Sequence, residues 1–133
     1  MAKSDTFQCS VVTPEKTVVE CAATFVAFPA HDGEMGILLN RAPLVCKLGI
    51  GQLRIESPGG DRALFVDGGF VEVADNRMTI LTEQAQDPTD IDRAAANQAL
   101  IEARALKITD EASLTARTNA IQRARVQMKL AHP

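Results

Sequence analysis

Residues 87–96 read DPTDIDRAAA and divide the chain into two unlike parts. All eight glycines, all five phenylalanines and all three cysteines lie before this stretch. No glycine or proline occurs over residues 89–132, where alanine becomes frequent. Glycine and proline punctuate turns, whereas an alanine-rich segment without either favours helix. The sequence therefore predicts two domains, one of residues 1–87 and one of residues 88–133.

Charge changes across the same boundary. Residues 1–90 carry 13 acidic against 7 basic side chains, whereas residues 91–133 carry 4 acidic against 7 basic, and the whole chain of 133 residues has a net charge of −3. An acidic balance argues against a nucleic-acid binder, because phosphate-binding domains are usually basic. No apolar run approaches the roughly 20 residues of a membrane helix, so we expect membrane contact only through a partner.

The chemistry of a catalytic or metal site is poorly represented. Cys9, Cys21 and Cys46 are odd in number and lack the spacing of a metal site, so we interpret them as free thiols in a reducing compartment. His31 and His132 complete no zinc site, and neither accompanies a nucleophile motif. An enzyme is therefore the least favoured class, and we expect no metal and no resident cofactor.

The front part has the pattern of an all-β domain. Hydrophobic residues at every second position predict strands, and turn residues recur about every ten positions. The alternating sets are Phe7, Cys9 and Val11; Cys21, Ala23, Phe25 and Ala27 on one strand; and Leu53 with Ile55. No helical crossover separates them, so we predict an antiparallel β-sandwich or flattened barrel.

Two glycine-containing turns interrupt this pattern. Residues 57–61 predict a tight reversal, and Asp67-Gly68-Gly69 predicts a break between two strands. The glycine pair lacks the lysine and hydroxyl residue of a phosphate-binding loop. We therefore interpret it as a place of close backbone packing.

The tail has the pattern of two helices. Thr89 is the expected cap of the first helix, with Asp92 as its capping-box acid, and residues 108–111 predict a new helix start. The expected buried face of the first helix is Ile91, Ala95, Ala99, Ala103 and Leu106, and that of the second is Leu114, Ile121, Ala124, Met128 and Ala131. The prediction is an antiparallel helical hairpin whose small side chains bury little area.

Three motifs occur in order along the chain. They read VVTPE at residues 11–15, GEMGIL leading to APL within residues 33–44, and GGFVEV at residues 68–73. Together with the alanine-rich tail, they resemble the epsilon subunit of F-type ATP synthase, named delta in mitochondria. The resemblance covers the whole chain and implies a β-sandwich followed by a helical hairpin.

The resemblance also implies a function. In that family the subunit binds the foot of the gamma stalk and the ring of membrane c subunits, catalyses nothing itself, and is needed to couple proton flow to ATP synthesis. Its C-terminal helices can rise toward the alpha and beta catalytic subunits and inhibit ATP hydrolysis. The expected location is the cytoplasmic face of the bacterial inner membrane, as a peripheral subunit.

The same resemblance implies contact residues for the c ring and gamma, although a plain hairpin turn explains the segment equally well. They are Glu34, Met35, Gly36, Leu39, Asn40 and Arg41. The family commonly has proline, glycine and histidine where this chain has its last three. Arg41 keeps a hydrogen-bond donor and gains a fixed charge, which suits acidic or carbonyl groups of the ring.

Two interpretations of Ile91 and Asp92 stay open. In some bacterial members a matching signature binds regulatory ATP, for which Arg123 would supply a phosphate contact. Here Ala95 and Ala96 stand where that signature has arginine and alanine, so the phosphate partner is missing. Asp92 as a plain helix cap is therefore favoured.

Basic residues gather on the second helix, and they too allow two interpretations. They are Arg117, Arg123, Arg125 and Lys129. They form a solvated face, or they contact an acidic segment of the beta subunits in the inhibitory state. A different overall alternative is a free-standing β-sandwich module that binds a small ligand or a peptide.

Overall fold

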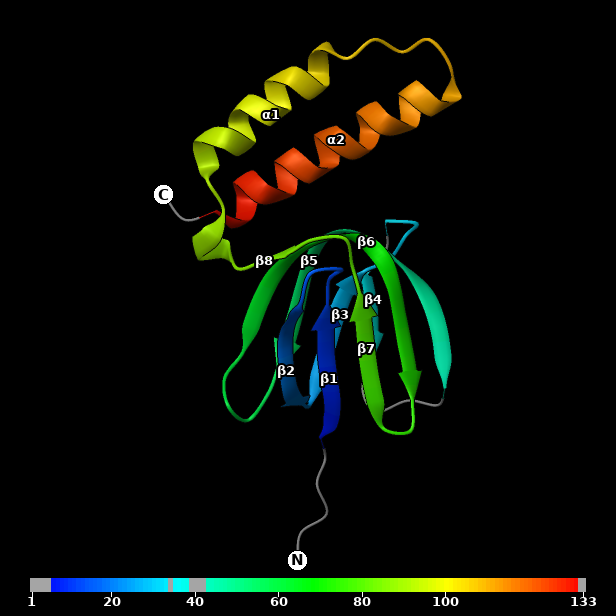
Figure 1. Cartoon of the computed structure of the whole chain (residues 1–133), viewed down its shortest axis with the longest axis vertical. Coiled ribbons are helices and arrows are strands. Elements are labelled where there is room, and N and C mark those ends of the chain that lie inside the picture. The colour runs from blue at the N-terminus through cyan, green and yellow to red at the C-terminus, as the bar shows by residue number, and fades with distance from the viewer. Residues whose placement is uncertain (1–5, 34, 39–42, 132–133) are drawn as a thin grey trace, which may run out of the picture.

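A strand-rich part is followed by a pair of antiparallel helices, as the sequence predicts (Figure 1). The computed structural model describes residues 6–33, 35–38 and 43–131. The strands are β1 (Phe7–Val12), β2 (Thr17–Ala23), β3 (Phe25–Pro29), β4 (Met35–Leu38), β5 (Leu44–Glu56), β6 (Arg62–Ala74), β7 (Arg77–Leu81) and β8 (Ala85–Gln86). The helical part consists of the 3-10 turn η1 (Pro88–Asp90) and the helices α1 (Arg93–Ala105) and α2 (Glu111–Leu130).

The strands are hydrogen-bonded in the order β2-β1-β7-β6-β5-β3-β4, and β8 pairs with β6. Most neighbours are antiparallel, but β1 and β7 are parallel, with Cys9 opposite Met78 and Val11 opposite Ile80. The prediction of purely antiparallel pairing is wrong at this position. Five intervening strands serve as the crossover that a helix usually provides, so the absence of helices did not exclude a parallel pair.

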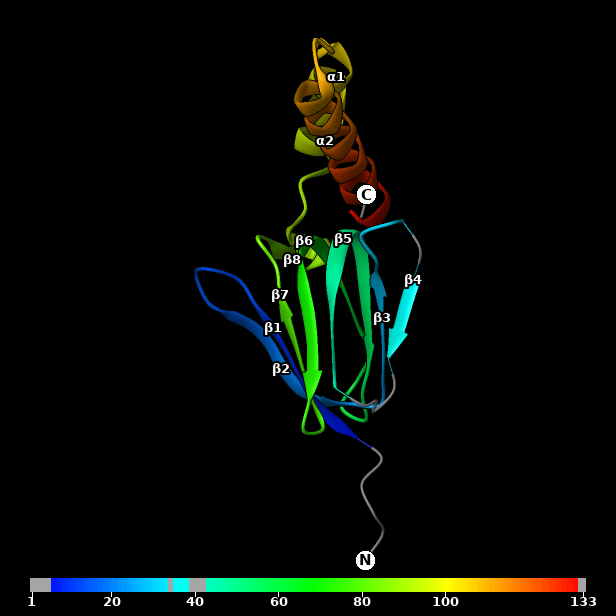
Figure 2. The same cartoon turned by 90° about the vertical axis from the view of Figure 1, so that its right-hand side faces the viewer.

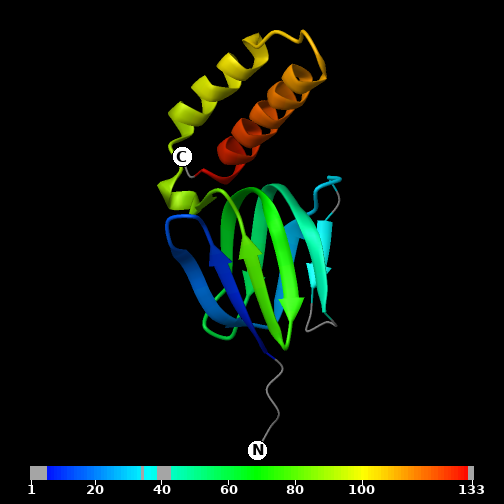
Figure 3. The same cartoon turned by 45° about the vertical axis from the view of Figure 1, so that its right-hand side comes forward.

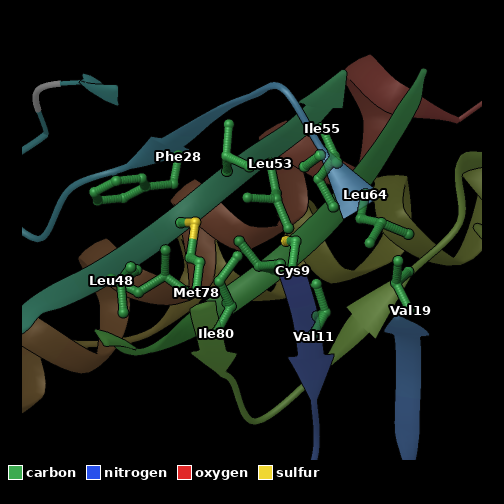
Figure 4. Packing of buried hydrophobic residues seen from close by; sticks show 14 of the residues in the cluster. Cys9, Val11, Val19, Phe28, Leu48, Leu53, Ile55, Leu64, Met78 and Ile80 are labelled. Atoms are coloured by element: carbon green, nitrogen blue, oxygen red, sulfur yellow. The ribbon is translucent and has the colours of Figure 1, made fainter. Parts of the chain in front are cut away.

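The sheet curls around one hydrophobic core (Figures 2 and 4). β5 and β6 are each 13 residues long and extend through both layers of the sandwich. Inward side chains of β1, β3, β5, β6 and β7 are fully buried, among them Cys9, Val11, Val26, Leu53, Ile55, Leu64, Met78 and Ile80. Each large side chain buried in this way stabilises the fold by about 1.5–3 kcal/mol, so the sandwich is rigid.

The second alternating set belongs to two strands rather than one. The chain breaks at Thr24, whose backbone N–H donates to the Glu56 carbonyl at 2.8 Å. Beyond this residue Val26 and Phe28 join the core, so the inward positions shift by one. A strand that leaves one sheet edge and pairs near the other must change its register, and hydrophobic alternation does not reveal this.

β6 is continuous through Asp67-Gly68-Gly69, where the sequence predicts a break. Gly68 has a φ of +72° and Gly69 a φ of +121°, conformations that only glycine adopts without strain. A Cβ on Gly69 would collide with the carbonyl oxygen of Leu81 on the neighbouring strand. The glycine pair therefore permits close backbone packing within β6, as expected for its second feature.

The helix boundaries follow carboxylate caps. The Asp87 side chain accepts from the Thr89 N–H and begins η1, while the Asp92 side chain accepts from the Ala95 N–H at 3.1 Å and begins α1. Thr89 is therefore not the cap of the first helix, and the helix-cap interpretation of Asp92 is confirmed. Asp110 caps α2 in a reciprocal capping box with Ser113, at the predicted second helix start.

The buried face of α1 lies one residue away from the predicted one. Ala96, Leu100 and Ala103 are buried on α1, whereas Ala95, Ala99 and Leu106 are exposed. On α2, Ala124 is buried and Leu114 is 45% exposed. Alanines occupy several faces of α1, so helical spacing alone did not distinguish them.

We predict that Gly69→Ala destabilises the sandwich by about 2 kcal/mol or more, because it combines backbone strain with a collision against β7. Urea denaturation of the full chain measures the change. Gly59→Ala is the matched control, since a Cβ there meets only the Ser57 hydroxyl at 4.0 Å. Equal stability of the two variants would contradict this role of Gly69.

Candidate functional site

The predicted c-ring segment leads into β4 at the end of the strand order (Figure 2). Met35 begins this strand and is 54% exposed. Gly36 packs so closely against the Phe28 ring that a Cβ would overlap it. Glu34, Leu39, Asn40 and Arg41, which belong to the same predicted contact set, lie outside the described residues. The structure thus places an exposed apolar side chain at a sheet edge.

The four basic residues predicted on α2 do not form one surface. The Arg117 guanidinium donates to the carbonyl of Arg104 at 3.3 Å, within the hairpin. Arg123 binds Asp67 of the sandwich. Arg125 and Lys129 are exposed. In this conformation two of the four therefore make internal contacts, and two face solvent.

The Arg123–Asp67 pair is bidentate. Arg123 Nε donates to Asp67 Oδ2 at 2.7 Å and its Nη2 donates to Oδ1 at 3.2 Å. The Asp67 side chain is 17% exposed and that of Arg123 is 38% exposed. Paired guanidinium–carboxylate bonds of this kind are stronger than single ones and fix the relative orientation of the two groups. They join the middle of α2 to the centre of β6.

A polar cleft of about 950 Å³ adjoins this pair, between α2 and the end of the sandwich. Its lining includes His31, Lys47, Asp67, Glu83, Arg123 and Arg125. Acidic and basic groups alternate around it, so it presents no uniform charge to a ligand. The cleft is a consequence of how the hairpin leans over the sheet (Figure 3).

The three residues of the nucleotide prediction each make an internal contact. Ile91 is buried in a small cluster with Phe65 and Ala131. Asp92 caps α1, and Arg123 pairs with the sandwich. Binding of ATP by this group stays a prediction, and it would require Arg123 to exchange its carboxylate partner for a phosphate.

The two helices cap one another. Arg93 in the first turn of α1 donates to the Met128 carbonyl near the end of α2, at 3.3 Å. Arg117 in the second turn of α2 donates to the Arg104 carbonyl at the end of α1. Carbonyls in the last turn of a helix have no partner within that helix. This reciprocal capping holds the hairpin together as a unit.

An apolar patch on the outer face of the sheet was missed by the sequence analysis. Phe70 and Leu81 are partners in the β6–β7 register and are 49% and 46% exposed. With Val12 and Pro14 they line a groove of about 350 Å³. The alternation of β6 carried the signal, because inward Val71 places its neighbour Phe70 on the outside.

The buried thiol of Cys9 is not a nucleophile at neutral pH. Burial, and then the nearby Cys21, raise the pKa of Cys9 to about 12. No cluster of three or more His, Cys, Asp or Glu side chains suited to a metal ion occurs in the described residues. Neither helix in the described part of the chain is long and apolar enough to cross a membrane.

Comparison with known proteins identifies the family. The model of the ATP synthase delta/epsilon chain β-sandwich domain matches residues 6–88. The chain belongs to the ATP synthase delta/epsilon family. It is 38% identical to the ATP synthase epsilon chain of Rhodopirellula baltica over 122 residues, which cover 92% of this chain and 95% of that one. It is 40% identical to the epsilon chain of Syntrophomonas wolfei, covering 98% of this chain and 90% of the relative.

A solved structure shares the fold of this delta/epsilon family member. A chain of the Euglena gracilis mitochondrial ATP synthase, solved as an OSCP/F1/c-ring assembly, superposes with a TM-score of 0.81 at 22% identity. The match covers 99% of this chain and 85% of that chain. Family membership makes the chain an epsilon-type subunit of the ATP synthase central stalk.

The cap of α2 gives this delta/epsilon chain a pH-dependent helix start. A hydrogen bond from the Ser113 backbone, and then one from its side chain, lower the pKa of Asp110. A lowered pKa in the folded state means that the ionised form is the one that folding favours. The contribution is therefore fully present above the ordinary carboxyl pKa of about 4 and is lost as the pH falls through the lower folded value.

We predict that Asp110→Ala lowers the thermal stability of α2 at pH 7 because it removes this cap. The difference from the unaltered chain should disappear at acid pH, where both lack the carboxylate cap. Circular dichroism at the helix band between pH 2 and 7 measures it. Asp90→Ala, an exposed carboxylate just before α1, is the control. A deficit that persists unchanged at the lowest pH would contradict the assignment.

Proposed function

We propose that the chain is a non-catalytic rotor subunit that joins the gamma subunit to the c ring and so helps couple proton flow to ATP synthesis. The observation that carries the proposal is the arrangement of surfaces on the sandwich. The outer patch around Phe70, the edge strand β4 and the face under the hairpin lie on different elements (Figures 1 and 2). A small domain can therefore hold several partners at once.

The outer patch is the surface we assign to gamma. Phe70 and Leu81 project from paired strands of a rigid sheet, so little conformational entropy is lost when a partner covers them. The adjoining groove, with Val12 and Pro14 in its lining, is suited to a side chain of the partner. Exposed apolar clusters of this kind mark protein-binding surfaces, and aromatic anchors dominate their affinity.

The sheet edge at β4 is the surface we assign to the c ring. Met35 is exposed there and follows the polar loop that contains His31 and Asp32. The assignment includes Gly36 and also Glu34, Leu39, Asn40 and Arg41, outside the described residues. Contact with the ring would hold the chain peripherally at the cytoplasmic face of the bacterial inner membrane, with no membrane segment of its own.

The hairpin is the element we assign to regulation of ATP hydrolysis. Its contact with the sandwich is small, and Arg125 and Lys129 remain exposed while docked. On leaving the sandwich it would present Arg123 as well, and this basic face would meet acidic segments of the alpha and beta subunits. Arg117, bound within the hairpin, would stay in place and support that face. Regulatory ATP is not required by this proposal.

We predict that deleting residues 89–133 leaves a folded sandwich that still binds gamma. The main core contains no residue of the tail, and the loss is restricted to contacts around Phe65 and Ile50. Stability should fall by about 2 kcal/mol as that apolar surface becomes exposed. Urea denaturation and co-purification with gamma measure the two effects.

The same truncation tests regulation in the assembled enzyme. ATP hydrolysis by the complex should be unchanged or higher, because an inhibitory element has been removed. Lower hydrolysis would contradict the inhibitory role, and an unfolded sandwich would contradict the division into two domains. A monomeric full chain that ignores gamma would instead favour the free-standing binding module.

We predict that Phe70→Ser weakens binding to gamma at least about tenfold, since it removes the aromatic anchor of the patch. Ile101→Ser is the matched control, because Ile101 is 54% exposed on α1, away from the sandwich. Titration of gamma against each purified chain gives the affinities, and thermal melting checks the fold. Equal affinities for the two variants would move the gamma surface elsewhere.

A further inference from the structure

We infer that the Asp67–Arg123 ion pair is a latch that keeps the hairpin on the sandwich and sets how readily it leaves. The latch is a property of the free chain and needs no partner subunit. It would govern how easily the proposed inhibitory element becomes available. It can nevertheless be tested, and can fail, without reference to the proposed function.

The position of the pair on α2 supports this role. Arg123, Gln127 and Ala131 follow one another at intervals of four, so they lie along one side of the helix. Arg123 binds Asp67 of β6, Gln127 donates to the Gln86 side chain of β8 at 2.9 Å, and Ala131 packs with Phe65. This stripe joins the helix to the sheet, and within the described residues the ion pair is its charged member.

The other members of the stripe are weak by comparison. The bond between the two glutamine side chains is neutral, and bonds to charged groups contribute roughly twice as much. The apolar cluster includes only Phe65, Ile91 and Ala131, with Ile50, Val126 and Leu130 partly buried around it. Loss of the ion pair would therefore remove a large part of what holds α2 down.

Asp67 is held in place for this contact. Its backbone N–H donates to the Thr82 hydroxyl at 3.1 Å and to the Gln84 carbonyl at 3.2 Å, and the Thr82 hydroxyl donates in turn to Gln84. Thr82 is only 4% exposed. Gly68 follows with a positive φ and turns the strand there. The carboxylate thus belongs to a fixed backbone and the guanidinium to the movable part.

Release does not require the hairpin to unfold. The bonds from Arg93 to Met128 and from Arg117 to Arg104 both lie within the hairpin and survive when it departs. The connection between β8 and α1 is short, over residues 87–92, and contains η1. The hairpin can therefore leave by turning about this connection once the stripe has opened.

The test uses the full chain with one tryptophan as reporter. The chain has no Trp and no Tyr, so Leu130→Trp, at the edge of the docking cluster, would be its only strong fluorophore. Acrylamide quenching then measures exposure of that face of α2. Val126→Trp serves as a second reporter, in case the first disturbs docking. Circular dichroism checks that helix content is unchanged.

Asp67→Asn and Arg123→Gln should each raise the undocked population about tenfold, seen as stronger quenching at unchanged helix content. The double variant should be no more undocked than either single variant, because both remove the same interaction. Arg125→Gln is the matched control: it removes a charge two residues further along α2, and Arg125 makes no hydrogen bond or ion pair within the described residues.

Quenching in the two latch variants that equals that of Arg125→Gln, with both reporters, would overturn the inference. Additive effects in the double variant would do the same, since they would mean that the residues act separately. Loss of helix content would show that the pair supports folding of the hairpin rather than its docking. None of these outcomes bears on whether the sandwich binds gamma.

Discussion

Strand β6 pairs with β5 along most of its length, with β7 over its second half and with β8 near residue 65. It can do so because Gly68 and Gly69 adopt positive φ values and bring the backbone against the Leu81 carbonyl. Three different tasks fall on this one strand. Val66 and Val71 enter the core, Phe70 faces outward, and the Asp67 side chain reaches the helix above. Disturbing its course would disturb all three.

The two parts of the molecule differ in how firmly they are built. The sandwich has a continuous core of large buried side chains, whereas the hairpin buries mainly alanines and is held by a short stripe of contacts. Elements with few buried apolar contacts are those that detach most easily. A rigid base that binds the stalk and a separable arm suit a subunit that assembles permanently and regulates reversibly.

The sequence predicted the order of elements, the sandwich, the hairpin and the family, because alternation, turn residues and helix breaks are local signals. It did not predict the pairing of Asp67 with Arg123, since residues that are 56 positions apart leave no local trace of their contact. Nor did it reveal the parallel β1–β7 pair, because a strand alternates in the same way beside either kind of neighbour. On α1 the abundance of alanine removed the contrast that distinguishes Ala95 from Ala96.

The way the two helices share their ends limits how such a tail can vary in length. Each helix relies on an arginine of the other to satisfy a carbonyl in its last turn. A chain that stopped after α1 would leave the Arg104 carbonyl to water and would expose the side of that helix lined by Leu100. In related sequences the hairpin should therefore be inherited or discarded as a block, and trimming it residue by residue should be disfavoured.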